Sequence, residues 1–322
     1  MFQGSLPKKC RLYYCRSNNL SNDSYFDIEN ETLYCGWNAG FFSNCSIAFR
    51  SLIDLFNRNI TPKKIDFSNS FHSYKTKAQI NKNLDLFPYY FSVDDRFQIP
   101  RNRKIRKPLT HGIYQNLDYY SFSPFMQKYF NLSSHILDIQ SALIEKYKFD
   151  PAKIIAVVYR GTDKYQEVNL ANPQLYLNKA EAILKQNTGF KVLIQTDQKQ
   201  VRDLFIDRFG EQCLFFEEMS VTEGKIGLHL LDEDCLGLNK FEFGKTILAV
   251  THLIAKCKFI VNHTGNMALW ICLFRGNARN MFQFDRKGNF VSRFYWIKYY
   301  PELFVDGLRI FYSSLTDKKS DR

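Results

Sequence analysis

The sequence predicts an α/β fold, because short apolar segments alternate with longer segments of helical periodicity from residue 154 onward. Strands that alternate with helices pair in parallel through right-handed crossovers. The segments at 154–159 and 191–195 are rich in branched apolar residues, as in strands covered on both faces. A length of 322 residues allows two domains. We place their boundary at Asp150-Pro151, which separates residues 1–150 from residues 151–322.

The first elements form a strand, a loop and a helix. Residues 1–30 are polar and predict an irregular lead-in, followed by a strand at 31–37, a tight loop at 38–40 and a helix at 41–56. The apolar stripe of this helix consists of Ile47, Phe49, Leu52, Ile53, Leu55 and Phe56. A helix that starts after a glycine loop presents free backbone amides, which suit a phosphate or a substrate group. The same turn also occurs as a purely structural connection.

The remainder of the first half gives shorter signals. Residues 65–67 predict a second strand. The aromatic segment 86–91 can pack on the core or stack on a sugar. Pro124 opens a predicted helix that runs through residue 129, and Ser133 caps another helix at 134–146.

The second half repeats strand and helix regularly. Strands are predicted at 154–159, 191–195, 213–216, 259–262 and 281–284, and helices at 172–186, 198–209, 244–256 and 266–274. Polar loops follow three of these strands, at 160–167, 196–198 and 262–266. Because parallel strands end at one edge of their sheet, we expect the three loops to meet there and to form the ligand site.

Arg160 stands at the end of the first of these strands. Its planar guanidinium group can bind a phosphate or a carboxylate through two hydrogen bonds and stays charged at any physiological pH. The alternative is a structural ion pair with Asp163 in the same loop. Lys164, Thr196 and Asp197 belong to the converging loops and are further candidates for binding a donor substrate.

The last polar turn and two carboxylates complete the predicted site. The turn consists of His263, Thr264, Gly265 and Asn266, and its amides and side chains can contact the same anion. Asp163 and Glu167 could take a proton from an attacking hydroxyl, and Arg160 with helix amides could neutralise a departing diphosphate without a metal ion. His263 is either a donor or base, or a structural hydrogen-bonding residue. No CxxC pair or HExxH motif indicates zinc.

The net charge of +12 predicts attraction to anions such as nucleotide phosphates, nucleic acid or an acidic membrane face. The densest basic segment is 101–107, which is either a solvated loop or a patch facing the acceptor or a membrane. The eight cysteines are dispersed, as is typical of buried thiols in a reducing compartment. No apolar run reaches membrane-spanning length. We therefore expect a cytoplasmic protein, with peripheral membrane contact as a further expectation.

The segment Val158-Tyr-Arg-Gly-Thr-Asp-Lys164 resembles the donor-site motif of the α-1,6- and O-fucosyltransferase superfamily, which includes nodulation-type bacterial enzymes. Similar spacing leads to Gln195-Thr-Asp197, and then through Gly244-Lys245 to the stretch from Ala255 to Asn266. The loop Gly36-Trp-Asn-Ala-Gly40 resembles its counterpart in the amino-terminal domain of that family. Together these segments cover roughly half of the chain.

The resemblance implies a GT-B-like fold, with two Rossmann-like domains facing a cleft. Residues 1–150 would form the acceptor-side α/β domain, and residues 151–322 the nucleotide-sugar-binding domain. It also implies an inverting, metal-independent glycosyltransferase that uses a GDP-sugar, most often GDP-fucose, as co-substrate, needs no other cofactor and acts on a glycan or glycoconjugate acceptor. By this resemblance Arg160 would bind the diphosphate, Asn266 would make a second phosphate contact, Glu167 would be the base, and Asn38 and Gly40 would lie on the acceptor-side loop.

Three positions depart from the pattern of the family. Val158 replaces a histidine, Val250 replaces the aspartate expected to read guanine, and Glu167 lies one residue nearer the motif. A transferase of the same fold that uses another nucleotide-sugar is therefore one alternative. A basic nucleic-acid-binding module is another, although the chain has no DNA- or RNA-binding motif and we expect no specific nucleic-acid partner.

Overall fold

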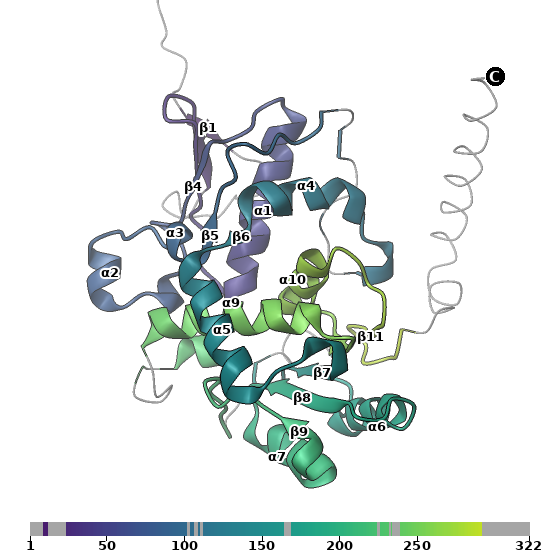
Figure 1. Cartoon of the computed structure of the whole chain (residues 1–322). Helices are drawn as coiled ribbons and strands as arrows, with labels where there is room; N and C mark the ends of the chain where they lie inside the picture. The colour runs from purple at the N-terminus through teal and green to yellow at the C-terminus, as the bar shows by residue number, and fades with distance from the viewer. Residues whose placement is uncertain are drawn as a thin grey trace, which may run out of the picture.

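The computed structural model describes residues 9–11, 24–101, 104–105, 109, 112–163, 169–223, 226–231, 233 and 239–291 (Figure 1). A four-stranded sheet belongs to the first part of the chain, and a five-stranded sheet to the second. Figure 1 shows helix α9 (Lys240–Lys256) crossing the middle of the molecule, between the first-half elements and the five-stranded sheet. The chain is therefore a mixed α/β protein, as predicted.

The five-stranded sheet consists of β7 (Ile154–Tyr159), β8 (Lys191–Thr196), β9 (Cys213–Leu214), β10 (Phe259–His263) and β11 (Met281–Phe284). All neighbouring strands pair in parallel, in the order β11-β10-β7-β8-β9. The chain builds outward from β7 to β9 and then returns to the other side of β7 with β10. This reversal between β7 and β10 is a topological switch point, where open α/β sheets bind ligands beyond the carboxyl ends of the strands.

Helices cover both faces of this sheet. They are α6 (Pro173–Leu184), α7 (Lys199–Phe209), α9 and α10 (Asn266–Arg275). All residues of β7 are buried, and their side chains alternate. Ile155 and Val157 pack in the cluster that contains α6 and α7 residues, whereas Ala156 and Val158 pack in the cluster that contains α9 and α10 residues. This arrangement confirms the prediction of a parallel sheet buried on both faces.

The first sheet consists of β1 (Lys9–Arg11), β2 (Tyr25–Asp27), β3 (Thr32–Tyr34) and β4 (Lys64–Asp66). Helix α1 (Phe41–Asn57) connects β3 to β4, and these two strands pair in parallel, which confirms the predicted strand, loop, helix and second strand. The prediction that residues 1–30 lack regular structure was wrong, because β2 pairs antiparallel with β3. The polar residues between them form a turn, in which the Asp27 side chain accepts a hydrogen bond from the Glu29 amide (3.0 Å).

Shorter elements complete the fold: η2 (His72–Tyr74), α2 (Lys77–Asn81), α3 (Phe87–Tyr90), β5 (Phe91–Ser92), η3 (Tyr114–Asn116), α4 (Tyr119–Tyr129), β6 (Asn131–Leu132), α5 (Ser134–Tyr147), η4 (Pro151–Lys153), η6 (Gly210–Gln212) and η7 (Leu228–Leu230). Two helices begin earlier than predicted. Asp118 caps α4 ahead of Pro124, and Asn239 caps α9 ahead of Gly244; each cap side chain accepts a backbone hydrogen bond.

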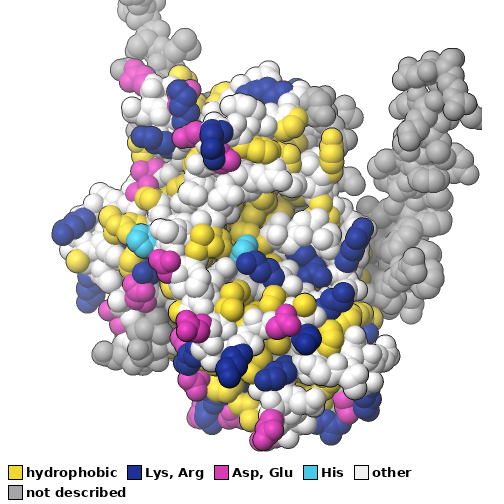
Figure 2. All heavy atoms as spheres, viewed as in Figure 1, with side chains coloured by type: hydrophobic (Ala, Val, Ile, Leu, Met, Phe, Trp, Pro, Cys, Tyr) yellow, Lys and Arg dark blue, Asp and Glu magenta, His cyan; other side chains and the backbone are white. Residues whose placement is uncertain are grey.

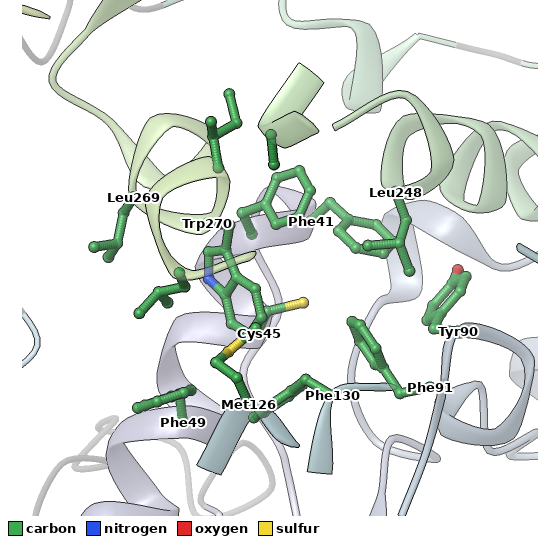
Figure 3. Packing of buried hydrophobic residues seen from close by; sticks show 14 of the residues in the cluster. Phe41, Cys45, Phe49, Tyr90, Phe91, Met126, Phe130, Leu248, Leu269 and Trp270 are labelled. Carbon is green, nitrogen blue, oxygen red and sulfur yellow. The ribbon is translucent and has the colours of Figure 1, made fainter. Parts of the chain in front are cut away.

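One hydrophobic cluster extends across the boundary predicted at residue 150. The ring of Trp270 in α10 packs 5.0 Å from that of Phe130 and 6.1 Å from that of Phe49, measured between centroids. Figure 3 shows these rings together with Phe91 and the sulfur of Cys45. The aromatic segment 86–91 therefore packs in the core. The division into two domains stays a prediction. A second Rossmann-like domain also stays a prediction, because only one pair of strands in the described part of the first sheet is parallel.

The predicted basic segment at 101–107 is described only in part. On the face shown in Figure 2, Lys and Arg side chains are interspersed with Asp and Glu side chains. Much of the predicted basic segment lies outside the described residues; Arg101 is described and places its guanidinium group 5.3 Å from the ring centroid of Phe56. Within the described ranges, no helix combines the length and apolar character that crossing a membrane requires.

Candidate functional site

A cavity of about 330 Å³ lies beyond the carboxyl ends of β7 and β8. Both halves of the chain contribute to its wall. The lining consists of residues 39–43, Tyr74, residues 158–160, Asp163, residues 195–197, Met219, Leu228, His229, Phe243, Ile247, Asn266 and Met267. The cavity has the volume of a small-molecule site and the position expected from the strand order.

Three loops meet at the base of this cavity, as predicted for their described parts. The backbone amide of Arg160 donates a hydrogen bond to Nε2 of His263 (3.2 Å). The amide of Gly161 donates to Oδ1 of Asp197 (2.8 Å), and the hydroxyl of Thr162 donates to Oδ2 of the same carboxylate (2.6 Å). Asp197 is buried and holds the loop after β7 in place, so its oxygens are occupied within the protein.

The guanidinium group of Arg160 lines the cavity and is paired on one side. Its Nη2 donates hydrogen bonds to both carboxylate oxygens of Asp163 (2.9 Å each), and its Nε donates to Oδ1 (3.2 Å). The predicted ion pair is thus present. Within the described part of the chain no hydrogen bond engages Nη1, and a Cβ placed on Gly40 would lie 4.0 Å from this atom. The arginine therefore keeps one donor group for a ligand.

Arg160 and Asp163 each favour the charged form of the other. Burial opposes the charge of Arg160, but the carboxylates of Asp163 and Asp197 raise its pKa above the ordinary value. Burial also opposes the charge of Asp163, but the charge and hydrogen bonds of Arg160 hold the pKa of that carboxyl below its ordinary value. The guanidinium side chain remains 35% exposed, so it is accessible from the cavity.

Two helices direct their amino termini at the same cavity. Residues 40–43 at the start of α1 and Asn266 with Met267 at the start of α10 all contribute to the lining. The amino end of a helix carries partial positive charge and unpaired amides, which favour anions. Two of the cavity-lining amides at the start of α1 are already paired: that of Phe41 donates to the Tyr74 hydroxyl (2.8 Å) and that of Ser43 donates to the Gly40 carbonyl (2.9 Å). Burial raises the pKa of the Tyr74 hydroxyl to about 12. This hydroxyl therefore keeps its proton at neutral pH.

The turn at 263–266 divides into one cavity residue and three residues that hold the turn. Nδ1 of His263 lies 3.0 Å from the carbonyl oxygen of Thr264, and the hydroxyl of Thr264 accepts a hydrogen bond from Gln283 (2.8 Å). The amide of Gly265 donates to the hydroxyl of Tyr114 (2.8 Å). Asn266 is the member of this turn that lines the cavity.

Asn266 is oriented by a residue of α1. The hydroxyl of Ser46 lies 3.0 Å from Oδ1 of Asn266 and accepts a hydrogen bond from the Trp270 indole (3.0 Å). Oγ of Ser46 also lies 2.7 Å from the carbonyl oxygen of Phe42, and its one proton can be donated to only one of these two acceptors. The contact with Ser46 therefore fixes the place of the Asn266 side chain in the cavity wall. The contact joins α1 to α10, two segments 220 residues apart in the sequence.

Of the other predicted site residues, some line the cavity and others do not. Thr196 and Gly40 line the cavity. Asn38 binds the backbone of a neighbouring segment: its Oδ1 accepts from His72 N (3.0 Å) and its Nδ2 donates to Asn69 O (3.0 Å). Lys164 and Glu167 lie outside the described residues.

Sequence reasoning did not find several cavity residues. His229 belongs to η7, in a connection without helical or strand periodicity, so no sequence pattern marked it. Phe243 and Ile247 form an apolar wall on α9. Val250, at the position expected to read guanine, is fully buried in α9 and is not among the cavity residues. The described wall contributed by α9 therefore has no acidic group.

Comparison with known proteins gives partial similarity. No family model matches the chain, and no curated protein matches it. A crystal structure of NodZ α-1,6-fucosyltransferase co-crystallised with GDP has a TM-score of 0.35 at 21% identity, covering 51% of this chain and 48% of that one. A second, soaked with GDP-fucose, has a TM-score of 0.36 at 18% identity, covering 54% and 53%. NodZ from Bradyrhizobium gives 0.33 at 19%, covering 51% and 48%. The similarity thus spans about half the length of each of these solved chains.

Proposed function

We propose that this chain is a glycosyltransferase that binds the diphosphate of a nucleotide-sugar in the cavity beside Arg160. The observation that carries the proposal is the convergence of Arg160 and the amino termini of α1 and α10 on one cavity. Each of these groups favours an anion, and together they suit a group with more than one negative charge. The cavity also has an apolar wall, against which a nucleobase can pack.

The finer proposal is inverting transfer from a GDP-sugar, with fucose as the sugar, to a hydroxyl of a glycan. It rests on the resemblance of the 158–164 motif to the fucosyltransferase superfamily. The acceptor oxygen attacks the anomeric carbon on the side opposite the diphosphate, and the carbon–oxygen bond to the diphosphate breaks. Arg160, Asn266 and the helix amides stabilise the negative charge of the departing diphosphate, so the proposal requires no metal ion.

Neither Asp163 nor Glu167 is well supported as the base that takes the proton of the acceptor hydroxyl. Asp163 binds Arg160 through both oxygens, and its lowered pKa makes it a weak proton acceptor. Glu167 stays a prediction from the resemblance.

Nucleotide binding tests this proposal directly. We expect calorimetry to show that GDP binds the wild-type chain and that Arg160→Ala lowers the affinity at least about tenfold, equivalent to ~1.4 kcal/mol. Arg160→Lys should recover part of the loss, since an ammonium group keeps the charge but not the planar pair of donors. Equal binding by wild type and Arg160→Ala would refute the anion site. Release of GDP from GDP-fucose should continue with excess chelator present.

The choice of nucleotide is tested by comparing GDP, UDP, ADP and CMP. Val250 and the apolar α9 wall offer no carboxylate to the guanine edge, which motivates the alternative of another nucleotide-sugar on the same fold. A GDP affinity at least tenfold above the other three would favour the GDP-sugar, and a preference for UDP, ADP or CMP would favour the alternative.

A further inference from the structure

His229 lies in the wall of the cavity, next to the ion pair of Arg160 and Asp163. A Cβ placed on Gly227 would lie 2.8 Å from Oδ2 of Asp163 and 2.9 Å from Cε1 of His229, so the carboxylate and the imidazole are neighbours. The 3₁₀ turn η7 places His229 at this point, between buried Leu228 and exposed Leu230.

The imidazole of His229 is available for proton transfer. Across the described residues, no hydrogen bond occupies either of its ring nitrogens. The histidine is only partly buried, and it faces the cavity that also contains the anion-binding groups. His263, by contrast, uses both ring nitrogens to hold the base of the cavity.

We propose that His229 is the general base that deprotonates the acceptor hydroxyl. This inference rests on the proposed glycosyltransferase function and assigns a role within that site. His229 is a side chain of the cavity wall that is both unengaged and able to accept a proton at neutral pH, whereas Asp163 is committed to Arg160.

The proton and electron pairs balance in one step. The imidazole nitrogen lone pair takes the acceptor O–H proton, and the oxygen electron pair forms the new bond to the anomeric carbon. The bond from that carbon to the diphosphate oxygen breaks, and its electron pair leaves on the diphosphate. His229 becomes imidazolium beside the Asp163 carboxylate and then returns its proton to solvent.

The charged groups around His229 support this cycle. Burial lowers the pKa of His229, and the Arg160 charge lowers it further, so the ring is neutral before reaction. Lys240 acts in the same direction, whereas Asp163 and Asp197 favour the protonated ring. Activity should therefore fall as the pH drops through a pKa below the ordinary histidine value of about 6.5.

The test uses the full chain with GDP-fucose as donor and water as acceptor, and measures GDP release between pH 4.5 and 8. We expect His229→Asn to lower the turnover rate about a hundredfold or more. The acidic decline of kcat/KM should disappear in this variant. Its affinity for GDP should stay within about twofold of wild type, because the anion-binding groups are untouched.

A matched control is His135→Asn, which changes an exposed histidine that stacks on Tyr89 at a centroid distance of 5.5 Å. It should keep both the rate and the pH profile. Wild-type turnover by His229→Asn, or an unchanged acidic decline, would overturn the role of His229 and leave the proposed function intact. A complete loss in Glu167→Gln with a normal profile in His229→Asn would assign the base to Glu167 instead. Absence of nucleotide binding by the wild-type chain would refute the glycosyltransferase proposal itself.

Discussion

The backbone amide of Arg160 donates a hydrogen bond to Nε2 of His263, at 3.2 Å, so a histidine of β10 holds the residue that follows β7. Nδ1 of the same ring lies 3.0 Å from the carbonyl oxygen of Thr264, which requires the proton to be on Nδ1. The neutral ring therefore joins two strands at the topological switch point, at the base of the cavity beside Arg160.

Replacing His263 should loosen this junction. His263→Ala removes the acceptor of the Arg160 amide at a buried position, so we expect the free energy of unfolding to fall by about 1–3 kcal/mol. Urea unfolding followed by circular dichroism measures the change. His135→Ala is the control, since that histidine is exposed on α5. Equal stability of His263→Ala and wild type would mean that the bond contributes nothing to the junction.

A carboxylate introduced at residue 40 should compete with the ligand. Gly40 has backbone angles that other residues adopt, and its Cβ would lie 4.0 Å from Nη1 of Arg160. Gly40→Asp should pair with that nitrogen and reduce GDP affinity by at least about tenfold, or ~1.4 kcal/mol. Gly40→Ala makes only an ordinary contact and should bind GDP like wild type. Calorimetry on both variants makes the comparison, and undiminished binding by Gly40→Asp would place the ligand elsewhere.

The Ser46 hydroxyl should matter for both stability and binding. In Ser46→Ala the buried Trp270 indole loses its acceptor and Asn266 loses its orienting contact. We expect the free energy of unfolding to fall by about 1–3 kcal/mol, together with weaker GDP binding. Ser141→Ala is the matched control, because that hydroxyl bonds a helix carbonyl (2.9 Å) at an exposed position. Similar behaviour of the two variants would contradict a special role for Ser46.

The ion pair of Asp163 should make stability depend on pH in the acidic range. Its folded-state pKa is lowered, so the contribution is complete above the unfolded value of about 3.9 and disappears as the pH falls through the lower folded value. Asp163→Asn should therefore lose less stability than wild type between pH 5 and pH 3. Urea unfolding at both pH values measures the difference, and Asp138→Asn, at an exposed position of α5, serves as control. Solvent screening of the partly exposed Arg160 keeps the effect small. Identical slopes for Asp163→Asn and wild type would exclude this linkage.

Periodicity predicted the five-stranded sheet well, because its strands are apolar, its helices have caps and apolar stripes, and alternation of the two dictates parallel pairing. Arg160 was found for the same reason, since it follows directly on a buried strand. β2 was missed because a strand of 3 residues carries no readable alternation. His229 and Tyr74 could not be found, because they reach the cavity from a patternless connection and from a short turn. Ser46 was missed because it contacts the cavity residue Asn266 from the interior of a helix. Only long-range packing brings such residues together.

The ring of Trp270 has a consequence for how this polypeptide must be made. It packs against aromatic residues that precede it by more than a hundred positions. A fragment containing either half alone would therefore expose a large apolar surface to water. Production of isolated halves should yield aggregates. Substitution of Phe49 or Phe130 should then disturb the cavity beside Arg160, even though neither side chain lines it.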